Sequence, residues 1–238
     1  RIFPVGSVLH LTGGEPTLYP HFTHLCFELT QEFTIGMNTN LSNDVMKEFA
    51  DTIDPTRVTV IHCAVHIEER MRREKSLDSF TRRFNYLQKR GFRVSANYVA
   101  YPSLLRRMSD DFAVLAMNGI QVVAKVFRGR YKGHLYPESY ADVERSLILP
   151  MLRTARDREF LIGVPSYLGR QCEAGSRFVV VTPEGDIHRC TTYRLEFPAN
   201  RLGTISDRSG IRLLRGPAMC MAKKCSCPYE GLRYAKER

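Results

Sequence analysis

The chain has 238 residues, of which 43% are hydrophobic and 25% are charged, as in an ordinary globular protein. No apolar run reaches the length of a membrane span and no signal-peptide pattern is present, so we expect no membrane partner and a cytoplasmic location. The net charge of +10 would suit a nucleic-acid partner, but no stacking-aromatic patch or recognition motif accompanies it, which disfavours that class.

Short apolar strands alternate with amphipathic helices from the start of the chain. Strands are predicted at residues 5–11, 33–37, 57–65, 92–100 and 120–127. Helices are predicted at residues 19–31, 45–53, 77–89, 103–118 and 139–158, the last interrupted by Pro150. Strands joined to helices by short links predict an α/β fold with a parallel sheet. Five strands are compatible with a partial or open βα barrel.

The first predicted strand ends in the run Gly13-Gly14-Glu15-Pro16. The glycines leave backbone N–H and C=O groups accessible, Glu15 supplies a carboxylate, and Pro16 suits the first turn of a helix. Backbone carbonyls and a carboxylate could together hold an ammonium group, although a plain tight turn between strand and helix explains the same residues.

Other polar residues lie near the ends of the following strands: Asn38, Thr39, Asn40, His62 and Asn97. In parallel sheets, ligands bind at the carboxyl ends of the strands. We therefore expect these side chains to converge with Glu15 where a ligand binds.

The composition changes after residue 165, where we place a boundary between domains 1–165 and 166–238. Residues 178–181 and 187–190 flank the turn sequence Pro183-Glu184-Gly185-Asp186 and predict a β-hairpin. No substantial helix is predicted after this hairpin until the last few residues. The preceding segment 128–140 is interpreted either as a packed loop or as a loop that contacts substrate.

The seven cysteines fall into two groups. Cys26 and Cys63 lie in apolar contexts typical of buried thiols. The other five lie in the last third of the chain: Cys172, Cys190, Cys220, Cys225 and Cys227. Without a secretory signal, this clustering favours metal ligation over disulfides. The spacing alone leaves zinc and an iron–sulfur cluster as alternatives.

Two motifs together resemble the radical S-adenosylmethionine (SAM) superfamily. One is Gly13-Gly14-Glu15-Pro16 after a strand; the other is Cys172, twelve residues, Gly185, four residues, Cys190, as in the family's SPASM/twitch extension. The resemblance implies a partial (βα)6-type TIM barrel that lacks its first βα unit, followed by a small cysteine-rich twitch-like domain. It also implies SAM and one auxiliary [4Fe-4S] cluster as cofactors.

The resemblance also assigns residues to these cofactors. Gly13, Gly14, Glu15 and Pro16 would hold the amino-acid end of SAM. Further contacts to SAM would come from Asn38, Thr39, Asn40, Asn97 and, replacing a frequent serine of the family, His62. Cys172 and Cys190 would ligate the auxiliary cluster, which would be completed by two of Cys220, Cys225 and Cys227.

One family feature is missing, because no C-x3-C-x2-C precedes Gly13. We expect an N-terminal truncation rather than a degenerate relative, and no SAM cleavage by this chain alone. The implied function is radical-based modification of a peptide, protein or small molecule, with electrons from a reductase or ferredoxin. The alternative is a non-catalytic module that binds SAM or a metal, as a zinc or iron–sulfur scaffold.

Overall fold

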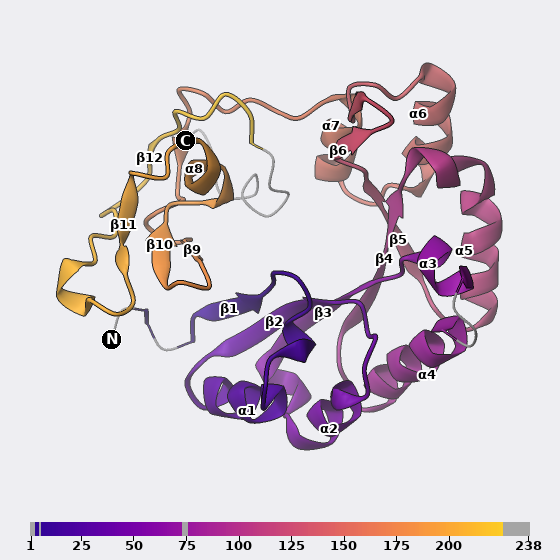
Figure 1. Cartoon of the computed structure of the whole chain (residues 1–238), viewed down its shortest axis with the longest axis horizontal. Helices are drawn as coiled ribbons and strands as arrows, with labels where there is room; N and C mark the ends of the chain where they lie inside the picture. Colours follow the sequence, from indigo (N-terminus) through magenta and orange to yellow (C-terminus); the bar gives the residue numbers. More distant parts are fainter. Residues whose placement is uncertain (1–2, 5, 73–75, 226–238) are drawn as a thin grey trace. The chain divides into compact units, whose positions relative to one another are not determined.

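The computed structural model describes residues 3–4, 6–72 and 76–225, and its chain folds into two compact units (Figure 1). Unit 1 comprises residues 3–127 and 140–153, and unit 2 comprises residues 128–139 together with those from 154 onward. Among the described helices, none combines the length and the apolar character needed to cross a bilayer.

Unit 1 is built on a five-stranded parallel sheet with strand order β1-β2-β3-β4-β5. Its strands are β1 (Val8–Leu11), β2 (Thr34–Thr39), β3 (Val58–Ala64), β4 (Val94–Ala100) and β5 (Val122–Val126). Each strand therefore pairs with the next one in sequence, as short βα repeats require. This confirms the predicted parallel α/β sheet.

Helices α1, α2, α4 and α5 follow one another along one face of this sheet (Figure 1). The α-helices of unit 1 are α1 (Phe22–Glu32), α2 (Val45–Thr52), α3 (Ile67–Arg72), α4 (Ser76–Lys89), α5 (Met108–Met117) and α6 (Asp142–Ile148). Short 3-10 turns are η1 (Pro16–Leu18), η2 (Pro55–Arg57), η3 (Pro102–Arg107) and η4 (Leu149–Met151). The sequence did not predict α3, which is a helix of only six residues.

The two faces of the sheet differ in polarity because successive side chains point to opposite sides. On the helix-covered face, Met37, Ile61, Ala96 and Ala124 are fully buried. The opposite face carries half-buried polar residues: His10, Asn38, His62, Ser95, Asn97 and Lys125. The alternation gives unit 1 an apolar core on one side of the sheet and a polar surface on the other.

The described part of unit 2 consists of short strands and two α-helices. Its described α-helices and strands are β6 (Gly129–Tyr131), β7 (His134–Tyr136), α7 (Ala155–Ile162), β8 (Gln171–Cys172), β9 (Val180–Val181), β10 (Asp186–His188), α8 (Thr191–Glu196), β11 (Arg201–Thr204) and β12 (Ala218–Met219). A 3-10 turn, η5, covers Arg208–Gly210. The predicted hairpin is present as β9 and β10, which pair antiparallel. Strand β11 pairs antiparallel with the other edge of β10 and completes a three-stranded sheet.

The structure differs from the sequence prediction at three places in this region. Residues 128–140 contain a hairpin of β6 and β7, because Lys132 and Gly133 both adopt positive φ and form a two-residue turn. The short helix α8 directly follows Cys190, where no substantial helix was predicted. Helix α7 belongs to unit 2, in which the Phe160 ring contacts the guanidinium of Arg128. The domain boundary at residue 165 stays a prediction.

We predict that Gly36→Ala destabilises unit 1. A Cβ atom on Gly36 of β2 would lie 2.8 Å from both His10 Nδ1 and Thr59 Oγ1, so one of these side chains would have to move. Overpacking of this kind lowers the free energy of unfolding by about 1–3 kcal/mol. Gly14→Ala is the matched control, since no atom lies within 4 Å of its Cβ position. Denaturant unfolding measures both, and equal stability of the two variants would contradict the prediction.

Candidate functional site

The turn after β1 presents bare backbone. Gly13 has φ of +134°, a conformation that side chains rarely adopt, and no atom lies within 4 Å of the Cβ position of Gly13 or Gly14. Glu15 follows as the cap of η1, which begins at Pro16. The peptide groups of the two glycines are therefore accessible to a ligand at the carboxyl end of β1.

The Glu15 carboxylate joins this turn to the end of β2. Its Oε1 accepts hydrogen bonds from Thr17 N (3.3 Å), Thr17 Oγ1 (2.7 Å) and Thr39 Oγ1 (2.7 Å). Its Oε2 accepts one hydrogen bond, from Asn40 N (2.6 Å). Thr39 and Asn40, both predicted as site residues, thus lie beside Glu15, while Oε2 keeps acceptor capacity for a further donor.

The Asn40 backbone is held from its other side by Arg70 of α3. The buried Arg70 guanidinium donates to the carbonyls of Asn40, Val65 and Ala64, and it lies 4.4 Å from the centre of the Phe80 ring. The ends of β2 and β3 are therefore fixed to each other. The sequence did not indicate Arg70, because nothing in the local pattern shows which carbonyls a surface-like arginine will reach.

Asn38 and His62 are register partners on the polar face of the sheet. Asn38 Oδ1 lies 3.2 Å from His10 Nε2, and Asn38 Nδ2 donates to Thr12 Oγ1 (3.1 Å). The rings of His10 and His62 lie 5.9 Å apart. Burial lowers the pKa of His62 to about 4, with smaller contributions from His10 and Lys125, so His62 is neutral at neutral pH. These residues form a polar wall rather than a cationic one.

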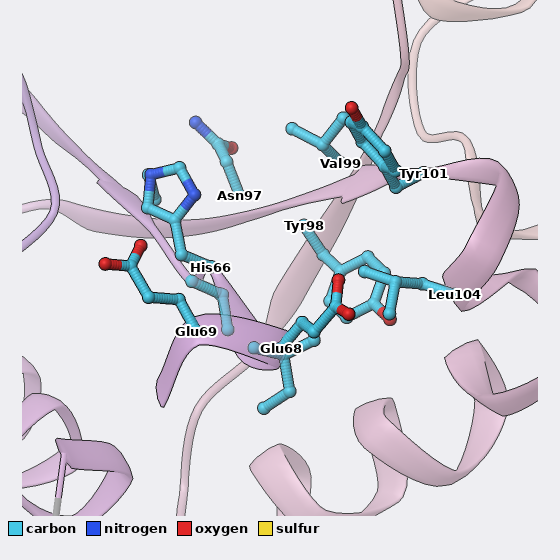
Figure 2. Close-up of a pocket in the computed structure, with 11 residues that line it drawn as sticks. His66, Glu68, Glu69, Asn97, Tyr98, Val99, Tyr101 and Leu104 are labelled. Carbon is cyan, nitrogen blue, oxygen red and sulfur yellow. The ribbon is translucent and has the colours of Figure 1, made fainter. Parts of the chain in front are cut away.

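Asn97 lines a pocket of about 200 Å³ at the ends of β3 and β4. Figure 2 shows Asn97 and Val99 on the same side of β4, with His66 and Glu69 beside them and Tyr101 further along the wall. Within the described residues, the buried Asn97 Oδ1 has no hydrogen-bond partner. A buried acceptor without a donor suits a ligand that brings a hydroxyl or amino group.

The predicted cysteine ligands that the structure describes lie in unit 2. Cys172, Cys190 and the partly buried Cys220 pack in one cluster with Ala174, Tyr193 and Ala222. Cys172 Sγ accepts from Ala174 N (3.5 Å), and Cys190 Sγ accepts from Tyr193 N (3.4 Å). Cys225 is buried, and its N–H donates to Pro165 O (2.8 Å). Cys227 lies outside the described residues.

These thiols are not arranged as a metal site in the structure. Within residues 3–225, apart from the gaps at 5 and 73–75, no three His, Cys, Asp or Glu side chains form a group that could hold a metal ion. Cys26 and Cys63 are fully buried in unit 1, as predicted, and burial raises the pKa of the Cys26 thiol to about 12.

The comparisons with known proteins concern the sequence family of part of the chain and its fold. Residues 3–112 match the sequence profile of the radical SAM superfamily. The structure is similar to native anSMEcpe with bound AdoMet and the Kp18Cys peptide, with a TM-score of 0.56, 16% identity, and coverage of 84% of this chain and 64% of that chain. No curated protein matches the chain.

Similarity also extends to SuiB of Streptococcus suis, with a TM-score of 0.56, 14% identity, and coverage of 85% of this chain and 54% of that chain. For SuiB bound to S-adenosylmethionine, the TM-score is 0.53 at 15% identity, with 85% of this chain and 53% of that chain covered. The chain thus spans less than two thirds of the length of these proteins. At such identities the similarity shows a common fold.

We predict that Glu15→Gln destabilises unit 1 by about 1–3 kcal/mol, the cost of leaving a partly buried polar group unpaired. If the glutamine oxygen takes the three donors of Oε1, its amide nitrogen faces the Asn40 N–H, and two donors then oppose each other. Glu28→Gln, at an exposed position of α1, is the control and should change stability by less than about 0.5 kcal/mol. Denaturant unfolding with equal midpoints for the two variants would refute a linking role for Glu15.

Proposed function

Since residues 3–112 belong to the radical SAM superfamily, we propose that this chain binds SAM along the carboxyl edge of the sheet, between the Gly13-Gly14 turn and the Asn97 pocket. The observation that carries the proposal is that three separate features at this edge fit one ligand. They are the open glycine turn, the acceptor capacity of Glu15 Oε2 and the unpartnered Asn97 Oδ1.

Each feature fits a different part of SAM. The carbonyls of the glycine turn and Glu15 Oε2 would accept hydrogen bonds from the methionyl ammonium group. Asn97 Oδ1 would accept from a hydroxyl or amino group of the adenosine, with the aliphatic and aromatic side chains of Val99 and Tyr101 beside it (Figure 2). Pro16 and Thr39 would act indirectly, because Pro16 begins η1 and Thr39 orients the Glu15 carboxylate.

When bound, SAM supplies an adenosyl group on a sulfonium, which is the source of radical chemistry in this superfamily. The cluster ligands for that chemistry, C-x3-C-x2-C, do not occur in the printed sequence. We therefore assign to this chain the binding and orientation of SAM. In the complete reaction, electrons would come from a reductase or ferredoxin.

The polar face of the sheet supports a polar substrate. His10, Asn38 and His62 line this face with neutral hydrogen-bonding groups, and Lys125 adds a cation. One structurally similar protein, anSMEcpe, has a peptide bound together with AdoMet. We propose that a peptide or protein segment is modified at this face, with a small molecule as the alternative.

We further propose that unit 2 holds an auxiliary [4Fe-4S] cluster on Cys172, Cys190 and two of Cys220, Cys225 and Cys227. Three of these cysteines share one buried cluster, and backbone N–H groups donate to the sulfurs of Cys172 and Cys190. Such hydrogen bonds stabilise thiolates and are a recurring feature of iron–sulfur sites. The alternative is a zinc scaffold, and analysis of the bound metal distinguishes zinc from an iron–sulfur cluster.

We predict that Gly14→Ala weakens SAM binding at least tenfold while leaving the fold intact. The added methyl group would meet no protein atom within 4 Å, so the fold should tolerate it. Because Gly14 lies in the proposed site, the methyl group would occupy space assigned to SAM. Gly216→Ala in unit 2 also meets open space and serves as the matched control. Isothermal titration calorimetry measures the affinity. Absence of SAM binding by the wild type, or unchanged affinity in Gly14→Ala, would refute the proposed site.

We also predict that anaerobic reconstitution with iron and sulfide loads about four irons per chain and produces a brown chromophore. Cys190→Ser should abolish this loading because it removes a proposed ligand. Cys26→Ala, at a buried thiol of unit 1, should retain it. Iron, sulfide and zinc analysis measures the outcome, and stoichiometric zinc without sulfide would establish the scaffold alternative.

A further inference from the structure

The hydroxyl of Thr12 ends a row of hydrogen bonds on the polar face of the sheet. Thr12 directly follows β1, precedes the Gly13-Gly14 turn and is exposed. Asn38 Nδ2 donates to Thr12 Oγ1 at 3.1 Å, and Asn38 Oδ1 lies 3.2 Å from His10 Nε2. One side-chain amide therefore connects a histidine ring of β1 to a hydroxyl at the carboxyl edge of the sheet.

This row has a direction, because Asn38 Oδ1 can only accept a hydrogen bond. The proton of that bond must then belong to His10 Nε2. Burial lowers the pKa of His10, and the bond to Asn38 raises it to a smaller extent, so the ring is neutral at neutral pH and carries one N–H. His10 is therefore the Nε2–H tautomer, and the amide nitrogen of Asn38 faces Thr12.

The same direction makes the Thr12 hydroxyl a donor. A threonine hydroxyl has one O–H and two acceptor lone pairs, and one lone pair of Thr12 receives the Asn38 amide. In the part of the chain that the structure describes, the Thr12 O–H meets no acceptor, whereas Thr59 Oγ1, on the same face, donates to Ile35 O at 3.2 Å. A donor at the edge of the glycine turn suits a ligand that carries an anionic oxygen.

The charge of the proposed site indicates which part of SAM needs this donor. Glu15 Oε2 and the carbonyls of the glycine turn are assigned to the methionyl ammonium group. The carboxylate of SAM is attached to the same carbon atom as that ammonium, so it would come near the carboxylate of Glu15. A carboxylate that loses water in such a place requires a hydrogen-bond donor.

We propose that the Thr12 hydroxyl binds the carboxylate of SAM, and that Asn38 and His10 are positioning residues that keep this hydroxyl a donor. The inference rests on the proposed SAM site. Acceptors at the glycine turn and Glu15 hold the ammonium group, and a donor at the preceding residue holds the carboxylate. The site thereby discriminates SAM from analogues that lack the carboxylate.

The alternative is a flipped amide, in which Asn38 Nδ2 faces His10 and Asn38 Oδ1 faces Thr12. Thr12 then donates to Asn38 and offers a ligand only acceptors, and His10 is the Nδ1–H tautomer. Long-range proton–nitrogen correlation NMR of the free protein at neutral pH should show His10 protonated at Nε2. The His10→Gln variant assigns the signal. Protonation at Nδ1 would overturn the proposal without any ligand being added.

The second test compares SAM with decarboxylated SAM by isothermal titration calorimetry of the full chain. Thr12→Val should weaken SAM binding about tenfold, because a hydrogen bond to a charged group is lost. Its affinity for decarboxylated SAM should stay within about threefold of the wild type. Thr12→Ser keeps the hydroxyl and should retain SAM affinity. Thr59→Val is the matched control, since its hydroxyl bonds to the backbone, and should change neither affinity.

The results separate this inference from the site on which it rests. Unchanged SAM affinity in Thr12→Val, or an equal loss for both ligands, would overturn the role of Thr12 alone. An equal loss of SAM affinity in Thr12→Ser and Thr12→Val would also overturn it, by assigning the position a steric role. Failure of the wild type to bind SAM would refute the proposed site and this inference with it.

Discussion

The geometry of the candidate site depends on the hydrogen bonds of the Glu15 carboxylate. This carboxylate accepts hydrogen bonds from the turn after β1 and from the end of β2. Asn40, which donates one of them, accepts a hydrogen bond from Arg70 through its own carbonyl. Arg70 also binds carbonyls at the end of β3. Three strands are thereby connected at their carboxyl ends by side chains that bind backbone groups, so the position of each strand end depends on its neighbour rather than on loop packing.

The sheet separates stability from function through its two faces. Residues that point toward the helices are apolar and fully buried, as with Met37 and Ile61, and provide the core of unit 1. Residues of opposite parity, such as Asn38 and His62, are half-buried and polar. Their burial costs desolvation, visible in the lowered pKa of His62, and adds little to the apolar core. A face of this kind is consistent with binding rather than with packing.

The sequence predicts the parts of this structure that depend on local pattern, and it misses those that depend on distant contacts. β-branched runs and strand–helix alternation identify all five strands of the sheet, and the turn residues identify the β9–β10 hairpin. Asn38, Thr39 and Asn40 were placed correctly at a strand end, but the bonds from Thr39 and Asn40 to Glu15 follow only from parallel pairing. Arg70 was not predicted, since the acceptors of its hydrogen bonds are backbone carbonyls, which every residue possesses.

The hydrogen bonds of Glu15 also limit how SAM could be held in the proposed site. Oε1 already accepts three donors, so only Oε2, with one, has capacity for an ammonium group. A methionyl ammonium has three N–H donors and would therefore need other acceptors, which the carbonyls of the Gly13-Gly14 turn can supply. In this arrangement the carboxylate acts mainly by fixing the turn, and the exposed peptide groups of the glycines make up the rest of the binding site. In the proposed site, the residues that permit the turn would thus also contact the ligand.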